Sequence, residues 1–116
     1  MSWDVKYLPE ALEDLRRLDG SQKILIRKAI QKVCKNPLPE NEGGYGKLLG
    51  NKNNTNLSGF LKIKLRGAGL RIVYQLIRHN DDMLVVVIGA REDDEVYEIA
   101  QKRITKHDLS RNLDRY

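Results

Sequence analysis

The sequence FLKIKLR at residues 60–66 alternates apolar and basic side chains, and it is followed by GAG at 67–69 and LRIVYQ at 70–75. Side chains of a β-strand point alternately to the two faces of a sheet, so this alternation predicts a strand that is buried on one face. The glycines between the two apolar segments predict a hairpin. One face of this hairpin therefore belongs to the core, and the other carries Lys62, Lys64 and Arg66.

The basic face of the hairpin has no acidic counterpart nearby, because residues 60–78 contain neither aspartate nor glutamate. Like charges destabilise a sheet when they lie across from one another on one face. A chain that keeps such a surface is expected to use it, and a polyanion is the ligand that fits it. The simpler interpretation is a solvated strand face, which is the commoner situation for alternating lysines taken alone.

Composition limits the class of protein. A chain of 116 residues with 41% hydrophobic and 32% charged residues predicts one folded domain. The net charge of +5 favours an acidic partner such as nucleic acid. The single cysteine, Cys34, excludes a disulfide within the chain, and the sequence shows neither a signal peptide nor an apolar run of membrane-spanning length. We therefore expect a cytoplasmic protein without a membrane partner.

The remaining chain alternates short helical and extended segments. Apolar residues at helical spacing predict three helices, at residues 9–17, 22–35 and 93–106, with Ser21 as the cap of the second. Period-two and continuous apolar segments predict strands at 3–7, 47–49, 60–66, 70–75 and 83–88, with a surface loop at 51–58 and a polar tail at 107–116. This order predicts an α+β fold over residues 1–116, a small, mostly antiparallel sheet with an N-terminal helical hairpin and a C-terminal helix.

Residues 61–97 contain a combination of positions that is typical of one protein family. They are Lys62, Ile63, Lys64, Leu65, Arg66, Gly69, Arg71, Val73, Tyr74, Gln75, Gly89, Arg91, Glu95, Val96 and Tyr97. With these residues the chain resembles the RelE family of toxins from bacterial toxin–antitoxin modules, within the RelE/ParE superfamily. It departs from the family pattern in its longer 51–58 loop, in Leu49 at a position that can be basic, and in the tail beyond Lys106.

The resemblance implies a function and a set of partners. RelE-like proteins are ribosome-dependent endonucleases that cut mRNA in the ribosomal A site, which inhibits translation, and a cognate antitoxin neutralises them. For this chain the resemblance implies a RelB-like or other small acidic antitoxin, and a toxin–antitoxin complex on operator DNA. It implies no metal, no cofactor and the catalytic residues Lys62, Lys64, Arg71, Arg91 and Tyr97. We add three candidate RNA-binding residues, Arg66, Lys47 and Lys52.

Strand register decides whether the two arginines join the lysines. If Arg66 lies opposite Arg71 across the hairpin, Arg71 belongs to the basic face. If the turn between His79 and Met83 leaves three residues unpaired, Arg91 belongs to the basic face as well. We prefer this register partly because of the resemblance.

Cleavage of RNA by the neighbouring 2′-hydroxyl needs a base, an acid, and cations that stabilise the phosphorane. The two histidines, His79 and His107, fall in a turn and in the tail, so a two-histidine ribonuclease is not expected. Arginine stays protonated and suits phosphate binding, whereas a lysine crowded by like charges gives up its proton more readily. Tyr97 could accept a proton, orient the hydroxyl or stack on a base.

The sequence also predicts dependence on the ribosome. Aromatic residues make up only 6% of the chain. With Trp3, Tyr7 and Tyr74 assigned to the core or the sheet, Tyr97 is the expected stacking residue near the cations. Phosphate contacts alone bind weakly and carry no sequence information, so another particle has to deliver the substrate.

Two other functions stay open. ParE-like toxins share the fold but poison DNA gyrase, and fold alone does not separate the two classes. A basic nucleic-acid-binding module without turnover is the third interpretation. Taken individually, Tyr97 is compatible with packing at the edge of the core, and Arg91 with an ion pair to Glu92 or Asp94.

Overall fold

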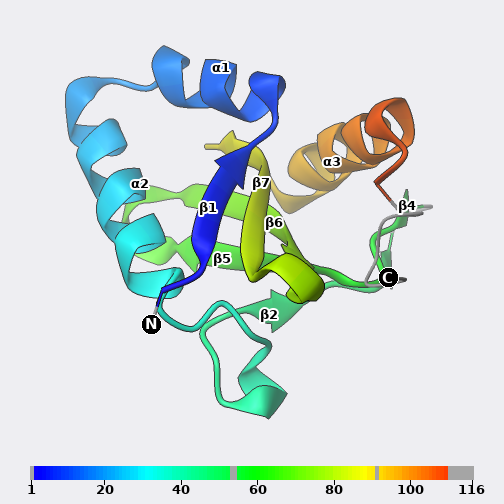
Figure 1. The fold of residues 1–116 in the computed structure, drawn as a ribbon. Coiled ribbons are helices and arrows are strands. Elements are labelled where there is room, and N and C mark those ends of the chain that lie inside the picture. Colours follow the sequence, from blue (N-terminus) through cyan, green and yellow to red (C-terminus); the bar gives the residue numbers. More distant parts are fainter. Residues whose placement is uncertain (1, 53–54, 91, 110–116) are drawn as a thin grey trace.

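The computed structural model describes residues 2–52, 55–90 and 92–109 (Figure 1). Its helices are α1 (Pro9–Arg17), α2 (Gly20–Val33) and α3 (Asp93–His107). Its strands are β1 (Asp4–Tyr7), β2 (Lys47–Leu48), β3 (Asn51–Lys52), β4 (Thr55–Asn56), β5 (Phe60–Leu65), β6 (Leu70–Ile77) and β7 (Asp82–Gly89). Short 3₁₀ turns occur at Glu40–Glu42, Arg66–Ala68 and Arg78–Asn80.

The main sheet has five strands in the order β1-β7-β6-β5-β2. Only the β1–β7 pair is parallel among the pairs of this sheet in the described chain; the other neighbours are antiparallel. Two neighbouring residues of β6 reveal what covers each face. The Tyr74 hydroxyl donates to the carbonyl of Pro37, just after α2, and the Gln75 amide donates to the carbonyl of Leu109, just after α3. The helical hairpin and α3 therefore pack on opposite faces, which confirms the α+β prediction.

The core lies between these layers. Tyr74, Ile72 and Leu70 of β6 are fully buried, as are Val85 of β7 and Ile26 of α2. Val96 and Ala100 of α3 are buried at the other face. The continuous apolar segment predicted as a doubly covered strand is β7, whose residues from Val85 to Ile88 are all buried.

Helix α2 begins two residues earlier than predicted, and its cap differs. The Asp19 carboxylate accepts a hydrogen bond from the backbone N–H of Gln22 (2.8 Å), and the Gln22 side chain accepts one from the backbone N–H of Asp19 (3.1 Å). This reciprocal pair is a capping box. The predicted cap, Ser21, is wrong: its hydroxyl donates to Asp19 instead.

The hairpin register differs from the prediction, although the predicted face is correct. Lys64 lies opposite Arg71, and Leu65 lies opposite Leu70, so the predicted Arg66–Arg71 pair is wrong. Arg66 is not available for pairing because it begins a 3₁₀ turn. Gly69 then closes that turn with a positive φ of 67°, a conformation that glycine adopts at little cost. Since the register differs by an even number of residues, Arg71 still shares the face of Lys64.

The next connection is longer than expected, and a β-bulge compensates for it. Ile77 pairs with Asp82, and the register then shifts between Val73 and Tyr74. Beyond this shift Arg71 lies opposite Gly89, so the two strands pair odd-numbered residues with odd-numbered residues, as a turn with three unpaired residues would also have done. Arg91 itself lies outside the described residues, so its predicted place on the basic face stays a prediction.

The predicted 51–58 surface loop is partly wrong. It contains the antiparallel strands β3 and β4, which form a second, two-stranded sheet, and Leu57 after them is 1% exposed. In the predicted tail, Leu109 is buried, while residues 110–116 lie outside the described part.

None of the described helices combines the length and the apolar character that crossing a membrane would require.

Candidate functional site

The basic residues of three adjacent strands meet on the sheet face that α3 covers in part. Lys47 of β2 lies opposite Lys62 of β5, and Lys64 of β5 lies opposite Arg71 of β6. Partners in neighbouring strands point to the same face, so both pairs join like charges. We call Lys47, Lys62, Lys64 and Arg71 the cationic cluster. Such pairs lower the stability of a sheet, and a bound anion would relieve that cost.

Helix α3 brings one polar group to the cluster. The Lys62 ammonium donates a hydrogen bond to the Tyr97 hydroxyl (2.8 Å) and lies 5.5 Å from the centroid of the Tyr97 ring. Tyr97 is only 3% exposed and belongs to the core. Its hydroxyl therefore reaches the cluster, whereas a base could stack on its ring only if α3 moved.

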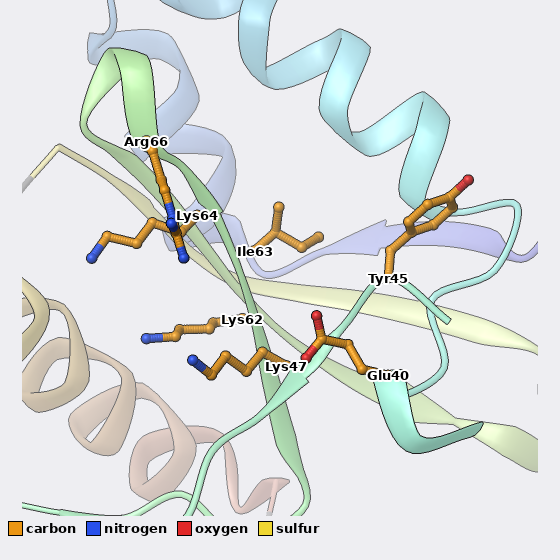
Figure 2. Close-up of a pocket in the computed structure, with 7 residues that line it drawn as sticks. All are labelled: Glu40, Tyr45, Lys47, Lys62, Ile63, Lys64 and Arg66. Carbon is orange, nitrogen blue, oxygen red and sulfur yellow. The ribbon is translucent and has the colours of Figure 1, made fainter. Parts of the chain in front are cut away.

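A pocket of about 230 Å³ opens beside the cluster at the edge of β5 (Figure 2). In Figure 2 the side chains of Lys47, Lys62 and Lys64 extend in one direction, and Glu40 and Tyr45 stand on the other side. The strand β2 covers only the first half of β5, because its pairing ends at Lys62. The pocket lies next to the part of β5 that β2 does not pair with. It is lined by Glu40, Tyr45, Lys47, Lys62, Ile63, Lys64 and Arg66.

The structure brings together most of the residues that the sequence singled out. Lys47, Lys62, Lys64, Arg66 and Arg71 all come from β2, β5, β6 or the turn between β5 and β6. The Arg71 guanidinium also donates to the carbonyl of Gly69 (3.3 Å). Lys52 belongs to β3 in the second sheet, apart from these strands, and its side chain lies outside the description.

The two histidines do not join the site. His79 is exposed in the turn between β6 and β7. His107, which ends α3, is half-buried and lies 3.0 Å from the Glu10 carboxylate of α1. Within residues 2–52, 55–90 and 92–109, no three His, Cys, Asp or Glu side chains gather closely enough to hold a metal ion.

Two pocket residues escaped the sequence analysis. Tyr45 is 48% exposed and lines the pocket, so Tyr97 is joined by a second aromatic residue near the cations. Glu40, from outside residues 60–78, places a carboxylate beside the cations of the hairpin, for which the sequence analysis found no acidic counterpart nearby. Both lie in a loop without periodic pattern. The available signal was an aromatic residue between Gly44 and Gly46, just before a basic strand.

Comparison with known proteins places this arrangement in a family. The model of the family "ParE toxin of type II toxin-antitoxin system, parDE" matches residues 5–95. A RelE-like toxin protein of Escherichia coli is 35% identical over 105 residues, which cover 90% of this chain and 99% of that protein. The chain belongs to the RelE family of toxins. This RelE-family chain is thus the toxin component of a toxin–antitoxin module, as the family resemblance of residues 61–97 implied.

Two further comparisons support the assignment. The mRNA interferase toxin RelE of E. coli K12 is 33% identical over 104 residues, covering 90% of this chain and 99% of that protein. A solved structure of an E. coli RelE mutant in the free state superposes with a TM-score of 0.70 at 30% identity, over 90% of this chain and 99% of that one. The residues that match the family model, 5–95, include the strands that carry the cationic cluster.

Proposed function

We propose that this RelE-family toxin is a ribosome-dependent endoribonuclease that cuts mRNA in the ribosomal A site and thereby stops translation. The observation that carries the proposal is the cationic cluster, in which Lys47 faces Lys62 and Lys64 faces Arg71, next to the Tyr97 hydroxyl. Two relatives that share a third of its sequence are named mRNA interferases.

The proposed chemistry is attack of an mRNA 2′-hydroxyl on the adjacent phosphate. The O2′–P bond forms, the P–O5′ bond breaks, and the products are a 2′,3′-cyclic phosphate and a 5′-hydroxyl. A base removes the proton of the 2′-hydroxyl, and an acid gives a proton to the leaving 5′-oxygen. No metal is needed because the fixed cations stabilise the charge that develops on the phosphorane.

The side chains of the cluster suit different steps. The Arg71 guanidinium can bind two phosphate oxygens at once and keeps its charge at any working pH. Lys62 and Lys64 are the proposed groups for proton exchange, because both line the pocket beside the phosphate-binding surface and an ammonium can donate a proton. The hydrogen bond from Lys62 to the Tyr97 hydroxyl links two groups that can carry a proton. Arg91 is proposed to add a further phosphate contact.

Dependence on the ribosome follows from what the site lacks. Tyr45 is an exposed aromatic residue beside the cations, but unaided binding of single-stranded RNA usually uses several stacking residues. Phosphate contacts fix no sequence and weaken with salt. A ribosome that holds the mRNA in cleavage geometry can supply positioning that is worth roughly 7–11 kcal/mol.

The decisive experiment compares naked mRNA with mRNA in programmed ribosomes at equal toxin concentration. We expect rapid cutting in the A site only with ribosomes, 5′-hydroxyl and cyclic-phosphate ends, and unchanged rates in EDTA-treated toxin added to washed ribosomes. The Lys62→Ala/Lys64→Ala variant serves as the inactive control. Efficient cleavage of naked RNA would instead identify a free-standing ribonuclease.

A second candidate function is inhibition of DNA gyrase, which the ParE family match over residues 5–95 favours. The cationic cluster argues against it, because a gyrase inhibitor does not need groups for phosphoryl transfer. A supercoiling assay with purified gyrase separates the two functions. Inhibition there, together with intact mRNA on ribosomes, would establish the ParE-like function.

We also propose that a cognate antitoxin masks the cluster. Solved complexes of related toxins contain such a partner: an E. coli RelE mutant bound to a RelB antitoxin peptide matches this chain at TM-score 0.64 and 28% identity, over 86% of this chain and 95% of that one. Acidic segments that fold on binding can cover a basic surface. Co-expression with the neighbouring gene should yield a complex and relieve growth arrest; failure of both would contradict the proposal.

A further inference from the structure

The loop at residues 36–46 is held in one conformation by its own hydrogen bonds. The backbone N–H of Glu40 donates to the carbonyl of Gly46 (2.8 Å), and that of Gly46 donates to Leu38 (3.0 Å). The backbone N–H of Tyr45 donates to the carbonyl of Asn36 (3.1 Å). Bonds of this kind at both ends and in the middle make the loop a fixed support rather than a flexible connection.

Two glycines let this loop pack closely against the rest of the molecule. A side chain at Gly44 would overlap the backbone of Leu38, and one at Gly46 would overlap the hydroxyl of Tyr74. The Tyr74 hydroxyl in turn donates to the carbonyl of Pro37 (2.7 Å). The loop is therefore anchored to the buried centre of β6.

This rigid loop nevertheless presents an aromatic ring to solvent. Tyr45 is 48% exposed, although it stands between two closely packed glycines. The Lys32 ammonium of α2 lies 5.0 Å from its ring centroid, which is a cation–π distance. The ring also lines the pocket that Lys62 and Lys64 line. A fixed, exposed ring beside a phosphate-binding surface is the arrangement by which proteins stack nucleic-acid bases.

Glu40 adds a hydrogen-bond acceptor to the same pocket. It is the one acidic residue among the described side chains that line it. Glu42, two residues further along the loop, differs: its carboxylate accepts hydrogen bonds from both terminal nitrogens of the Arg78 guanidinium, at 3.0 and 2.9 Å. A carboxylate accepts hydrogen bonds from the exocyclic amine of a base and repels a carbonyl oxygen at the same place. Glu40 thus favours cytosine over uracil.

We propose that the pocket formed by this loop and β5 is a nucleobase subsite, in which Tyr45 stacks on a base next to the cut and Glu40 accepts a hydrogen bond from that base's exocyclic amine. The inference rests on the proposed cleavage of RNA and deepens it. The cationic cluster binds phosphate and reads no sequence, whereas the loop supplies a preference at one base. The pocket of about 230 Å³ has room for one planar base.

Single-turnover cleavage in programmed ribosomes tests the subsite. A set of A-site codons places cytosine or uracil at each position in turn. For wild type we expect one position at which cytosine is cut about tenfold faster than uracil. Tyr45→Ala should lower cleavage at that codon about tenfold, and Tyr45→Phe, which keeps the ring, should restore most of it. Glu40→Gln should abolish the preference by raising the rate at uracil toward the rate at cytosine, because an amide can donate to O4 as well as accept from an amine.

Glu42→Gln is the matched control, because it removes a carboxylate from the same loop outside the pocket. It should leave both the rate and the preference unchanged. Equal cleavage by wild type, Tyr45→Ala and Glu40→Gln at every codon would overturn the subsite while the cleavage function stands.

A binding measurement separates failure of the subsite from failure of the proposed function. Non-cleavable dinucleotides with a 2′-deoxy group, containing cytosine or uracil, are titrated into the toxin. The Tyr45 ring signals, assigned by comparison with Tyr45→Phe, are followed by NMR. We expect larger shifts with cytosine, and a loss of that difference in Glu40→Gln. Shifts without any ribosomal cleavage would refute the nuclease but keep the subsite. Tyr45 signals that do not respond, with wild-type cleavage in Tyr45→Ala, would refute the subsite alone.

Discussion

The cationic cluster and the junction between α1 and α3 arrange charges in opposite ways. In the junction the Arg103 guanidinium binds both oxygens of Asp14, at 2.6 and 3.1 Å, and Asp14 also accepts the backbone N–H of Ile88. Arg103 donates to the carbonyl of Val86 as well. Every charge there has an opposite partner. In the cluster, by contrast, Lys47 faces Lys62 and Lys64 faces Arg71 across the sheet.

This difference separates groups that hold the fold from groups that are suited to bind an anion. A half-buried ion pair loses stability when one member is removed, because the other is left desolvated. Removing a member of a like-charged pair relieves repulsion instead. The two regions are nevertheless connected: the junction fixes α3, and α3 places the Tyr97 hydroxyl 2.8 Å from Lys62. Mutations in the two regions should therefore have separable effects on stability and on cleavage.

The largest expected effect is on cleavage, in Lys62→Ala/Lys64→Ala. Loss of a good donor to the transition state costs about two to three orders of magnitude in rate, so the double variant should be inactive. Its melting temperature should change little, because two like-charged pairs disappear together with the hydrogen bond from Lys62 to Tyr97. Cleavage rates on ribosomes and thermal unfolding are measured on the same samples. A folded double variant with the wild-type rate would show that the cluster is not the active site.

The second prediction concerns the hydrogen-bonding geometry of the positively charged group at position 71. Arg71→Lys keeps the positive charge but loses the two-pronged hydrogen bonding of a guanidinium. We expect cleavage to fall about a hundredfold, within the range for one lost transition-state contact. The single-turnover rate checks this, with Arg71→Ala as the lower reference. A rate equal to wild type would reduce Arg71 to a general electrostatic contribution.

The basic face could be predicted from sequence because alternation has a fixed physical meaning. The period of two placed Lys62 and Lys64 on one face and Leu61 and Ile63 on the other, whatever the register. Register itself depends on the turn, and the 3₁₀ turn that begins at Arg66 leaves no periodic signal. The β-bulge between Val73 and Tyr74 could not be predicted either, because a β-branched and an aromatic residue are equally typical of a regular strand.

Contacts between distant segments were beyond the reach of the sequence. Tyr45 and Glu40 join the pocket because loop 36–46 folds back on itself through backbone hydrogen bonds, which any residue can make. Asp14 and Arg103 are separated by most of the chain, and nothing in either helix marks the other as its partner. Tyr97 was assigned correctly to the neighbourhood of Lys62 by the family resemblance, whereas its burial follows from the packing of α3.

The third prediction tests the junction by removing its acidic member. Asp14→Ala removes the carboxylate that accepts hydrogen bonds from the Arg103 guanidinium and the Ile88 N–H. The Asp14 side chain is only 15% exposed, so water replaces these hydrogen bonds poorly. We expect a loss of about 2–3 kcal/mol in the free energy of unfolding, measured with urea. Cleavage per folded molecule should stay near wild type at low temperature.

The matched control for this variant is Glu13→Ala on the same helix. Glu13 pairs with Arg16 at 3.0 Å, but both side chains are about half exposed or more. Its removal should change stability by less than about 0.5 kcal/mol. Equal losses in the two variants would mean that burial does not distinguish the junction from an ordinary surface pair.

The smallest effect is expected at the outer part of the junction, in Glu10→Gln. Hydrogen bonds from Lys106 and His107 lower the pKa of the Glu10 carboxyl from its ordinary value of 4.5 to about 2. The distances are 2.8 Å to Lys106 and 3.0 Å to His107. Because the Lys106 side chain is 69% exposed, solvent screens this pair, and its loss should cost less than about 1 kcal/mol at neutral pH.

The pH dependence of this variant gives the sharper test. A carboxyl whose pKa is lower in the folded protein stabilises it fully above the pKa of the unfolded chain, and this contribution fades as pH falls toward the folded value. The difference in unfolding free energy between wild type and Glu10→Gln should therefore shrink as pH falls from 4.5 to about 2. Urea unfolding at a series of pH values measures it. A difference that persists unchanged at the acid end would show that Glu10 stabilises α3 through packing and not through charge.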